Sequence, residues 1–187
     1  MHTIEQSINI NVPIRTAYNQ WTQFETFPEF MEGVEEVRQL DDKRLHWVAE
    51  IAGRRHEWDA EIHEQVPDER IAWRSISGQP NEGAVRFEKT GENQTRVSVI
   101  IRFEPAGALE KAGDALGIAG ARVKGDLKRF KDFIESHGVE TGAWRGEIHR
   151  GETNREVGST PRSKRLFNEQ SGSISASGTS DSGMGNQ

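Results

Sequence analysis

Three tryptophans and one histidine of this 187-residue chain are spaced so that they could line an apolar binding site. Trp47, Trp58 and Trp73 each fall at the apolar positions of an alternating segment, and His56 stands two positions before Trp58 on the same predicted strand face. A histidine beside apolar rings could orient a carbonyl group or move a proton near neutral pH. It could equally be a hydrogen-bonded residue at the sheet rim. Tyr18, the only tyrosine, is a second candidate donor because its hydroxyl can donate a hydrogen bond.

Other catalytic arrangements are absent from the sequence. The chain has no cysteine, which excludes disulfides, thiolate nucleophiles and thiolate metal sites. Its six histidines show no HExxH or similar metal spacing, and no GxSxG elbow occurs. Gly113, Gly117 and Gly120 lie inside a helical pattern instead of between a strand and a helix, so they do not form a phosphate loop. We therefore expect neither a metal nor a cofactor.

The elements that would position these residues can be predicted from periodicity. Residues 3–12 alternate as a half-buried strand, and Pro13 fits the first turn of a helix. Pro28 interrupts the following apolar segment, which predicts two short helices that end near Gly33. A run of strands with short turns then predicts an antiparallel meander. Its inner face carries alternating apolar residues: Leu45, Trp47, Ala49, Ile51, Trp58, Ala60, Ile62, Ile71, Trp73, Val85, Phe87, Val97, Val99, Ile101 and Phe103.

Two hairpins can be predicted in register. A two-residue turn at 53–54 would set Ala49 opposite Trp58 and Trp47 opposite Ala60, pairing large with small side chains. A three-residue loop at 91–93 would align Phe87 with Val97.

A long amphipathic helix is predicted to begin after Pro105 and to end at Gly138. Its apolar stripe consists of Leu109, Ala112, Leu116, Ala119, Val123, Leu127, Phe130 and Ile134. Glycines recur along it at 107, 113, 117, 120 and 125, and each interior glycine costs a helix about 1 kcal/mol relative to alanine. The glycines either leave room for a ligand above the sheet or let the helix move; the alternative is that the helix packs closely on the sheet or is broken in its first half.

Composition indicates one folded domain followed by a polar tail. Hydrophobic residues make up 33% of the chain and charged residues 29%, and residues 151–187 are almost entirely polar. We expect a domain over 1–138, a short extension over 139–150 and a disordered tail over 151–187. The net charge of −6 does not suit a nucleic-acid-binding surface. Without a signal peptide or a membrane-spanning run, the expected location is cytoplasmic.

The sequence motifs resemble those of one family. FPEFMEGVEEV, RIAWRSISG, GAVRFEKTGENQTRVSVIIRFEP and DLKRFKDFIESHG are similar to segments of the polyketide cyclase/dehydrase group of the START-like, or SRPBCC, superfamily, which includes coenzyme Q-binding START-type proteins. TGAWRGEI is similar to an extension on bacterial members. The resemblance implies an α+β helix-grip fold, in which a curved antiparallel sheet of about seven strands wraps a long C-terminal helix and leaves an apolar cavity between them.

The predicted function is the binding or carriage of a hydrophobic small molecule, such as a lipid, quinone or polyketide, with transient membrane contact if the cargo is a lipid. The expected ligand-binding residues are Phe27, Phe30, Met31, Trp47, His56, Trp58, Trp73, Phe87, Leu116 and Val123. Any of the aromatic residues could instead be ordinary core. Two alternatives remain: a polyketide cyclase/dehydrase that uses His56 or Tyr18 for proton transfer, and a partner-binding or stress-associated protein.

Overall fold

The computed structural model describes residues 1–51, 53–78, 80–104 and 112–154. The chain begins with strand β1 (His2–Ile10), helix α1 (Ile14–Trp21) and the 3₁₀ helix η1 (Phe24–Glu29). Six strands follow: β2 (Val34–Gln39), β3 (Arg44–Ile51), β4 (Arg54–Val66), β5 (Arg70–Ser75), β6 (Asn81–Gly91) and β7 (Gln94–Phe103). Helix α2 (Ala112–His137) and the short strands β8 (Glu147–His149) and β9 (Glu152–Asn154) complete the described part.

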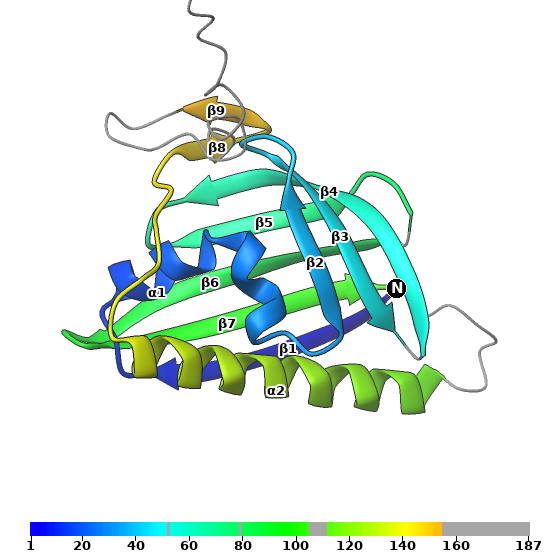
Figure 1. Cartoon of the computed structure of the whole chain (residues 1–187), viewed down its shortest axis with the longest axis horizontal. Coiled ribbons are helices and arrows are strands. Elements are labelled where there is room, and N and C mark those ends of the chain that lie inside the picture. The colour runs from blue at the N-terminus through cyan, green and yellow to red at the C-terminus, as the bar shows by residue number, and fades with distance from the viewer. Residues whose placement is uncertain (52, 79, 105–111, 155–187) are drawn as a thin grey trace, which may run out of the picture.

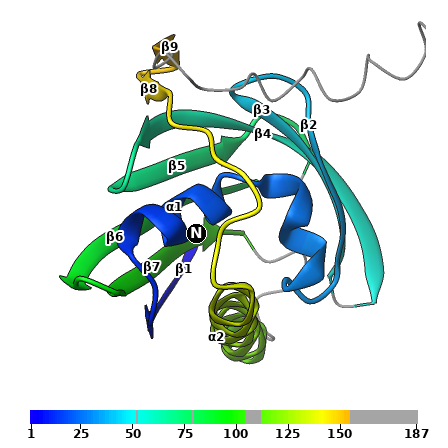
Figure 2. The same ribbon diagram turned by 60° about the vertical axis from the view of Figure 1, so that its left-hand side comes forward.

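The strands form one antiparallel sheet in the order β1-β7-β6-β5-β4-β3-β2, and β8 and β9 extend it beside β4. The sheet curves around α1 and η1, and α2 runs along β1 at the open side of the curve (Figures 1 and 2). The predicted α+β architecture, an antiparallel meander with a long C-terminal helix packed against it, is confirmed. Two short helices are also found, α1 and η1, but Pro28 lies inside η1 instead of between them.

The predicted register of the β3–β4 hairpin is wrong by two residues. Trp47 lies opposite Trp58 and Ala49 lies opposite His56. Strand β3 ends at Ile51, which pairs with Arg54, the first residue of β4, so Arg54 belongs to the strand and not to the turn. Gly53 has φ +74°, a backbone conformation that glycine adopts at little cost, and this places it inside the turn. The turn length is still even, so both tryptophans face inward as predicted.

The β6–β7 hairpin has the predicted alignment with a different turn. Phe87 lies opposite Val97, as expected. Strand β6 continues to Gly91, which pairs with Gln94, and a bulge between Lys89 and Gly91 absorbs the extra residue. The connection is therefore two residues plus a bulge instead of a three-residue loop.

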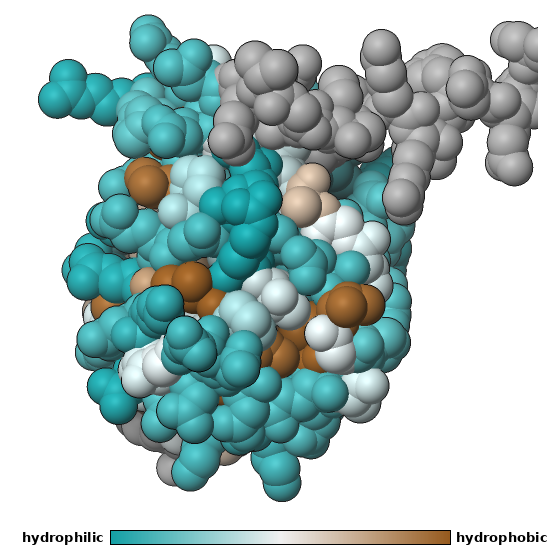
Figure 3. Space-filling model, turned by 90° about the vertical axis from the view of Figure 1, so that its left-hand side faces the viewer, coloured by the Kyte–Doolittle hydropathy of each residue, from teal (hydrophilic) through white to brown (hydrophobic). Residues whose placement is uncertain are grey.

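The core is concentrated at the end of the sheet that α1 covers, which we call the closed end. The Trp21 ring makes edge-on contacts there with Phe27, Phe87 and Phe130, at centroid distances of 5.5, 6.2 and 4.9 Å. Such aromatic pairs stabilise a core beyond their buried area. The surface over this end is largely hydrophilic, with small separate apolar patches (Figure 3).

Residues 139–154 form a strap across the closed end. Trp144 and Ile148 are fully buried in the main core, and Ile148 pairs with Gln65 of β4. The segment expected to be a short extension therefore contributes two core residues. Strand β9 lies within the segment from 151 onward that was expected to be disordered, and the remaining tail, 155–187, lies outside the described residues.

Candidate functional site

The inward-facing residues of the sheet change from buried to half-buried along its length. At the closed end, Ile10, Val85 and Val97 are completely buried. At the other end, beside the β3–β4 turn and the first half of α2, the inward-facing tryptophans of β3, β4 and β5 are only half-buried. We call this second region the open end. Half-buried inward-facing rings indicate that the core there is not filled by side chains as it is at the closed end.

Two tryptophans form the centre of the open end. The rings of Trp47 and Trp58 stack face to face, with centroids 5.7 Å apart and planes 8° apart. Phe27 lies against Trp47 at 5.8 Å and joins this stack to the core. The indole Nε1 of Trp47 is enclosed and has no hydrogen-bond acceptor within the described part of the chain. A buried donor left in this state costs about 1–3 kcal/mol, so an acceptor supplied at this point would be stabilising.

Trp73 extends the apolar wall over β6. It lies opposite Gly83, and a Cβ built on Gly83 would be 2.5 Å from Trp73 Cζ2 and 2.7 Å from the carbonyl oxygen of Ile100. The indole therefore lies directly against the strand backbone, which only glycine allows. The sequence predicted that Trp73 faces inward, but the role of Gly83 was not predicted.

Helix α2 faces this wall with small residues. Leu116 and Val123 are half-buried. A Cβ added at Gly117 would meet no atom within 4 Å, and one added at Gly120 would meet only Gln6 Nε2, at 3.9 Å. Gly117 is exposed, so the space around it is solvent, and only the half-buried Gly120 lies toward the sheet, where an added Cβ would have a single neighbour. Gly125 differs because its added Cβ would lie 3.2 Å from the Arg129 guanidinium, and Gly107 lies outside the described residues.

The two candidate proton-transfer residues lie in different surroundings. His56 is half-buried at the open end, opposite Ala49, and its ring makes no hydrogen bond within the described residues. Tyr18 is fully buried at the closed end, where its hydroxyl accepts a 2.9 Å hydrogen bond from Gln65 Nε2 and its ring packs edge-on against Phe87. The structure therefore does not bring His56 and Tyr18 together, and only His56 borders the open end.

The remaining predicted ligand-binding residues lie deeper or farther out. Phe27, Phe30 and Phe87 are each at most 5% exposed and belong to the core. Met31 is half-buried beside Phe30 and lines a surface hollow of about 300 Å³ with Arg129. Trp47, Trp58, Trp73 and His56 thus lie at the open end of the sheet, Leu116 and Val123 are half-buried on α2, and the phenylalanines belong to the core.

Residues 10–132 match the family model described as polyketide cyclase / dehydrase and lipid transport. The chain belongs to this family. An uncharacterized 17.2 kDa protein from Streptomyces lincolnensis is 50% identical over 149 residues, which cover 79% of this chain and 99% of that protein.

Solved structures of START-like proteins share the fold. A START superfamily protein from Mycobacterium smegmatis superposes with a TM-score of 0.66 at 14% identity, over 73% of this chain and 99% of that one. The ZhuI aromatase/cyclase from Streptomyces sp. R1128 gives 0.61 at 14% identity, over 76% of this chain and 98% of that one. The predicted START-like, or SRPBCC, relationship is confirmed.

A set of charged residues on α2 holds this family member's open end in place, and sequence reasoning missed it. Arg122 donates from Nε and Nη2 to the carbonyl oxygen of Glu32, at 2.9 and 2.6 Å. Asp126 Oδ1 accepts the Glu32 N–H at 2.9 Å, and Arg129 Nε donates to the Phe30 carbonyl at 2.9 Å. Burial raises the pKa of Asp126 above its usual range, against the opposing hydrogen bonds from Glu32 and Arg129. These contacts attach α2 to the η1–β2 connection.

Two classes of site are not found in the part of the chain described here. No group of three or more histidine, cysteine, aspartate or glutamate side chains among these residues is arranged to hold a metal ion. None of the described helices has the length and apolar character needed to cross a membrane.

Proposed function

We propose that this protein binds a hydrophobic small molecule of the lipid, quinone or polyketide class between the open end of the sheet and helix α2. The observation that carries the proposal is the exposure of inward-facing tryptophans: Trp47, Trp58 and Trp73 point toward the interior and are nevertheless half-buried. Exposed apolar surface in a concave region is typical of a ligand site. The family's description, which includes lipid transport, supports the same class of ligand.

The energetics favour an occupant. Covering apolar surface contributes about 25 cal/mol per Å², so a ligand that shields part of three indole rings gains several kcal/mol. The enclosed Nε1 of Trp47 adds a polar requirement, because a ligand carbonyl that reaches it would satisfy an otherwise unpaired donor. A flat apolar molecule with a carbonyl group fits both features. We therefore expect quinones and aromatic polyketides to bind more tightly than saturated fatty acids.

The first experiment identifies the cargo. Protein purified from its own host is analysed by native mass spectrometry, and its organic extract by mass spectrometry. Purified protein is then titrated with a short-chain quinone, a fatty acid and an aromatic polyketide while tryptophan emission is recorded. Saturable quenching by the flat carbonyl compounds is expected. Unchanged emission with all three ligands, together with an empty extract from folded protein, would contradict the proposal.

A matched pair of substitutions at Gly120 tests the location. Gly120→Ala and Gly120→Leu both remove a helix glycine, and each should raise helix stability by up to about 1 kcal/mol. Only leucine extends into the space beside Gln6, where an added Cβ has its nearest neighbour at 3.9 Å. We expect Gly120→Leu to weaken ligand binding about tenfold or more, a free-energy change of about 1.4 kcal/mol, and Gly120→Ala to leave it nearly unchanged. Equal binding by both variants would place the ligand elsewhere.

The position of His56 supports a second candidate function, a cyclase or dehydrase. Its ring borders the open end without a hydrogen-bond partner within the described residues, so it is free to contact a substrate carbonyl. The cyclase/dehydrase part of the family description agrees with this chemistry. If the protein turns over a polyketide chain, His56→Ala should abolish turnover while quinone binding persists. Intact turnover in that variant would remove His56 from the mechanism.

A further inference from the structure

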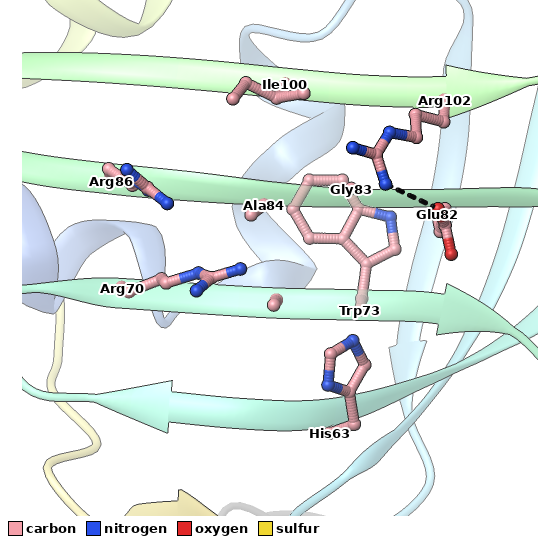
Figure 4. Close-up of a pocket in the computed structure, with 10 residues that line it drawn as sticks. His63, Arg70, Trp73, Glu82, Gly83, Ala84, Arg86, Ile100 and Arg102 are labelled. Atoms are coloured by element: carbon pink, nitrogen blue, oxygen red, sulfur yellow. Dashed lines mark hydrogen bonds and ion pairs between the residues drawn. The ribbon is translucent and has the colours of Figure 1, made fainter. Parts of the chain in front are cut away.

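A hollow of about 240 Å³ lies over strands β5, β6 and β7 (Figure 4). Ala72, Ala84 and Ile100 stand side by side in register and form its apolar floor. They alternate with the inward-facing Ile71 and Val85, so the hollow lies on the convex face, opposite the proposed ligand site. The hollow forms because the alanine side chains on β5 and β6 are shorter than the arginine side chains around them.

Cationic side chains surround this floor. Arg70 and Arg86 lie directly opposite each other on β5 and β6, and Figure 4 shows both guanidinium groups between these two strands. Arg102 lines the opposite side and His63 reaches the edge from β4. Like charges at directly opposite strand positions destabilise a sheet. Because the whole chain carries a net charge of −6, this concentration of arginines is local and runs against the overall charge.

The ion pairs around the hollow leave part of this positive charge unneutralised. Arg102 pairs with Glu82 at 3.1 Å, and Arg70 Nη1 pairs with Glu64 at 3.1 Å. Arg86 has no ion pair or side-chain hydrogen bond with any other described residue, and it is exposed. The Nε of Arg70 is enclosed and has no acceptor within the described residues. An anion between the two guanidinium groups would relieve their repulsion and supply the missing acceptor.

We propose that this hollow is a binding site for a phosphate monoester group. Its oxygens would bridge Arg70 and Arg86, and the organic part of the molecule would lie over Ala72 and Ala84. Phosphate matches the geometry because it offers several acceptor oxygens to two planar guanidinium forks. The group can belong to a soluble metabolite or to a lipid headgroup. The two arginines of this site lie on the opposite face of the sheet from the hydrophobic ligand, although Trp73 and Gly83 of the hydrophobic wall also border the hollow.

The test is a titration of the ¹⁵N-labelled full chain with inorganic phosphate at constant ionic strength, followed through the arginine Nε–Hε signals. We expect saturable shifts of the Arg70 and Arg86 signals. Arg86→Gln removes an exposed side chain without a described partner and should weaken binding about tenfold or more. Arg70→Lys keeps the charge, loses the planar fork and should also weaken binding. Arg96→Gln is the matched control, because Arg96 is an exposed arginine on the same face that does not line the hollow.

A second arm separates the two sources of phosphate. Flotation with phosphatidylcholine vesicles that contain phosphatidic acid, compared with phosphatidylcholine alone, tests a lipid headgroup. Arg86-dependent binding to the phosphatidic acid vesicles supports a lipid source, and saturable binding of free phosphate without vesicle binding supports a soluble one. No saturable binding in either arm would overturn the proposal, and so would equal weakening by Arg86→Gln and Arg96→Gln, because any surface charge would then serve as well.

Discussion

Removing the strap at residues 139–154 should destabilise the whole domain. A chain that ends at Gly138 lacks Trp144 and Ile148, both of which are fully buried. It also loses polar contacts to α1, because Thr141 N–H donates to Gln20 Oε1 at 2.8 Å and Trp144 N–H donates to Thr22 Oγ1 at 3.1 Å. The strap is therefore bonded to α1 as well as packed on the sheet.

The magnitude follows from the buried area. A tryptophan buries about 150–250 Å², which at about 25 cal/mol per Å² contributes about 4–6 kcal/mol. A buried isoleucine adds about 1.5–3 kcal/mol. The combined loss of about 5.5–9 kcal/mol is an upper estimate, because the unfolded chain already shields part of this surface. Domains of this size have total stabilities of about 5–15 kcal/mol, so the chain 1–138 should retain little of its stability or fail to fold.

The assay is urea denaturation followed by far-ultraviolet circular dichroism, which does not depend on Trp144 as a reporter. The chain 1–154 is the control, because it keeps every contact described here, and its midpoint should match that of the full chain. Full-length Trp144→Ala separates the buried ring from the rest of the strap and should cost about 3–5 kcal/mol. Because the chain 1–138 should fail to fold stably, it should also lose ligand binding.

The reasoning would be refuted if chains 1–138 and 1–154 unfolded at the same urea concentration. That outcome would mean that the area buried by Trp144 and Ile148 is compensated by rearrangement of the closed end. A partial result is also informative. If Trp144→Ala costs as much as the whole truncation, the ring alone carries the effect and the hydrogen bonds of the strap contribute little.

Two further predictions concern single residues. Gly83→Ala should lower the free energy of unfolding by about 1–3 kcal/mol and change tryptophan emission, because the new Cβ would lie 2.5 Å from the Trp73 ring and 2.7 Å from the Ile100 carbonyl oxygen. Urea unfolding measures the change in stability. Gly117→Ala is the control, because a Cβ added at Gly117 would meet no atom within 4 Å. Burial acts to raise the pKa of Glu140, but the 2.7 Å hydrogen bond from Asn19, together with the hydrogen bonds from its own backbone and from Thr16 and the charge of Arg15, lowers that pKa overall. Its stabilisation is therefore present at neutral pH and lost as pH falls through the folded-state pKa. The melting temperature of Glu140→Gln should be lower than wild type at pH 7 and converge with it in acid; a pH-independent difference would contradict this.

The strand faces could be predicted because alternation of period two is a strong signal. Every register with an even turn length places Trp47 and Trp58 on the same face, so the face was correct although the pairing was not. The pairing failed because AGRR contains two possible two-residue turns at this hairpin. Gly53, with φ +74°, lies inside either turn, so the pairing of Ile51 with Arg54 decides between them, and this pairing is a property of the folded sheet that the sequence leaves open.

Other features have no periodic signal. Trp144 is the single aromatic residue of a polar segment, so nothing in its spacing indicates that it is fully buried. Arg122 and Arg129 donate to the backbone carbonyls of Glu32 and Phe30. Every residue has a backbone carbonyl, so the sequence does not indicate which one accepts the hydrogen bond. From the sequence alone, these charged residues are therefore expected on a solvent-exposed face of the helix. Such contacts depend on which loops the fold brings to the helix, which is decided by tertiary packing.

The same alternation that forms the core also places two proposed sites back to back. On β5, Arg70 and Ala72 face the convex hollow, while Ile71 and Trp73 face the interior. The two sites lie on opposite faces of the sheet and have only Trp73 and Gly83 in common, so substitutions at other positions of one site should leave contacts at the other intact. Gly120→Leu should therefore weaken hydrophobic ligand binding without changing the phosphate titration, and Arg86→Gln should do the reverse. If either variant changed the binding of both ligands, β5 and β6 would have to transmit a structural change between the two faces of the sheet. Such coupling would pass through Gly83, because the Trp73 ring contacts the strand backbone there.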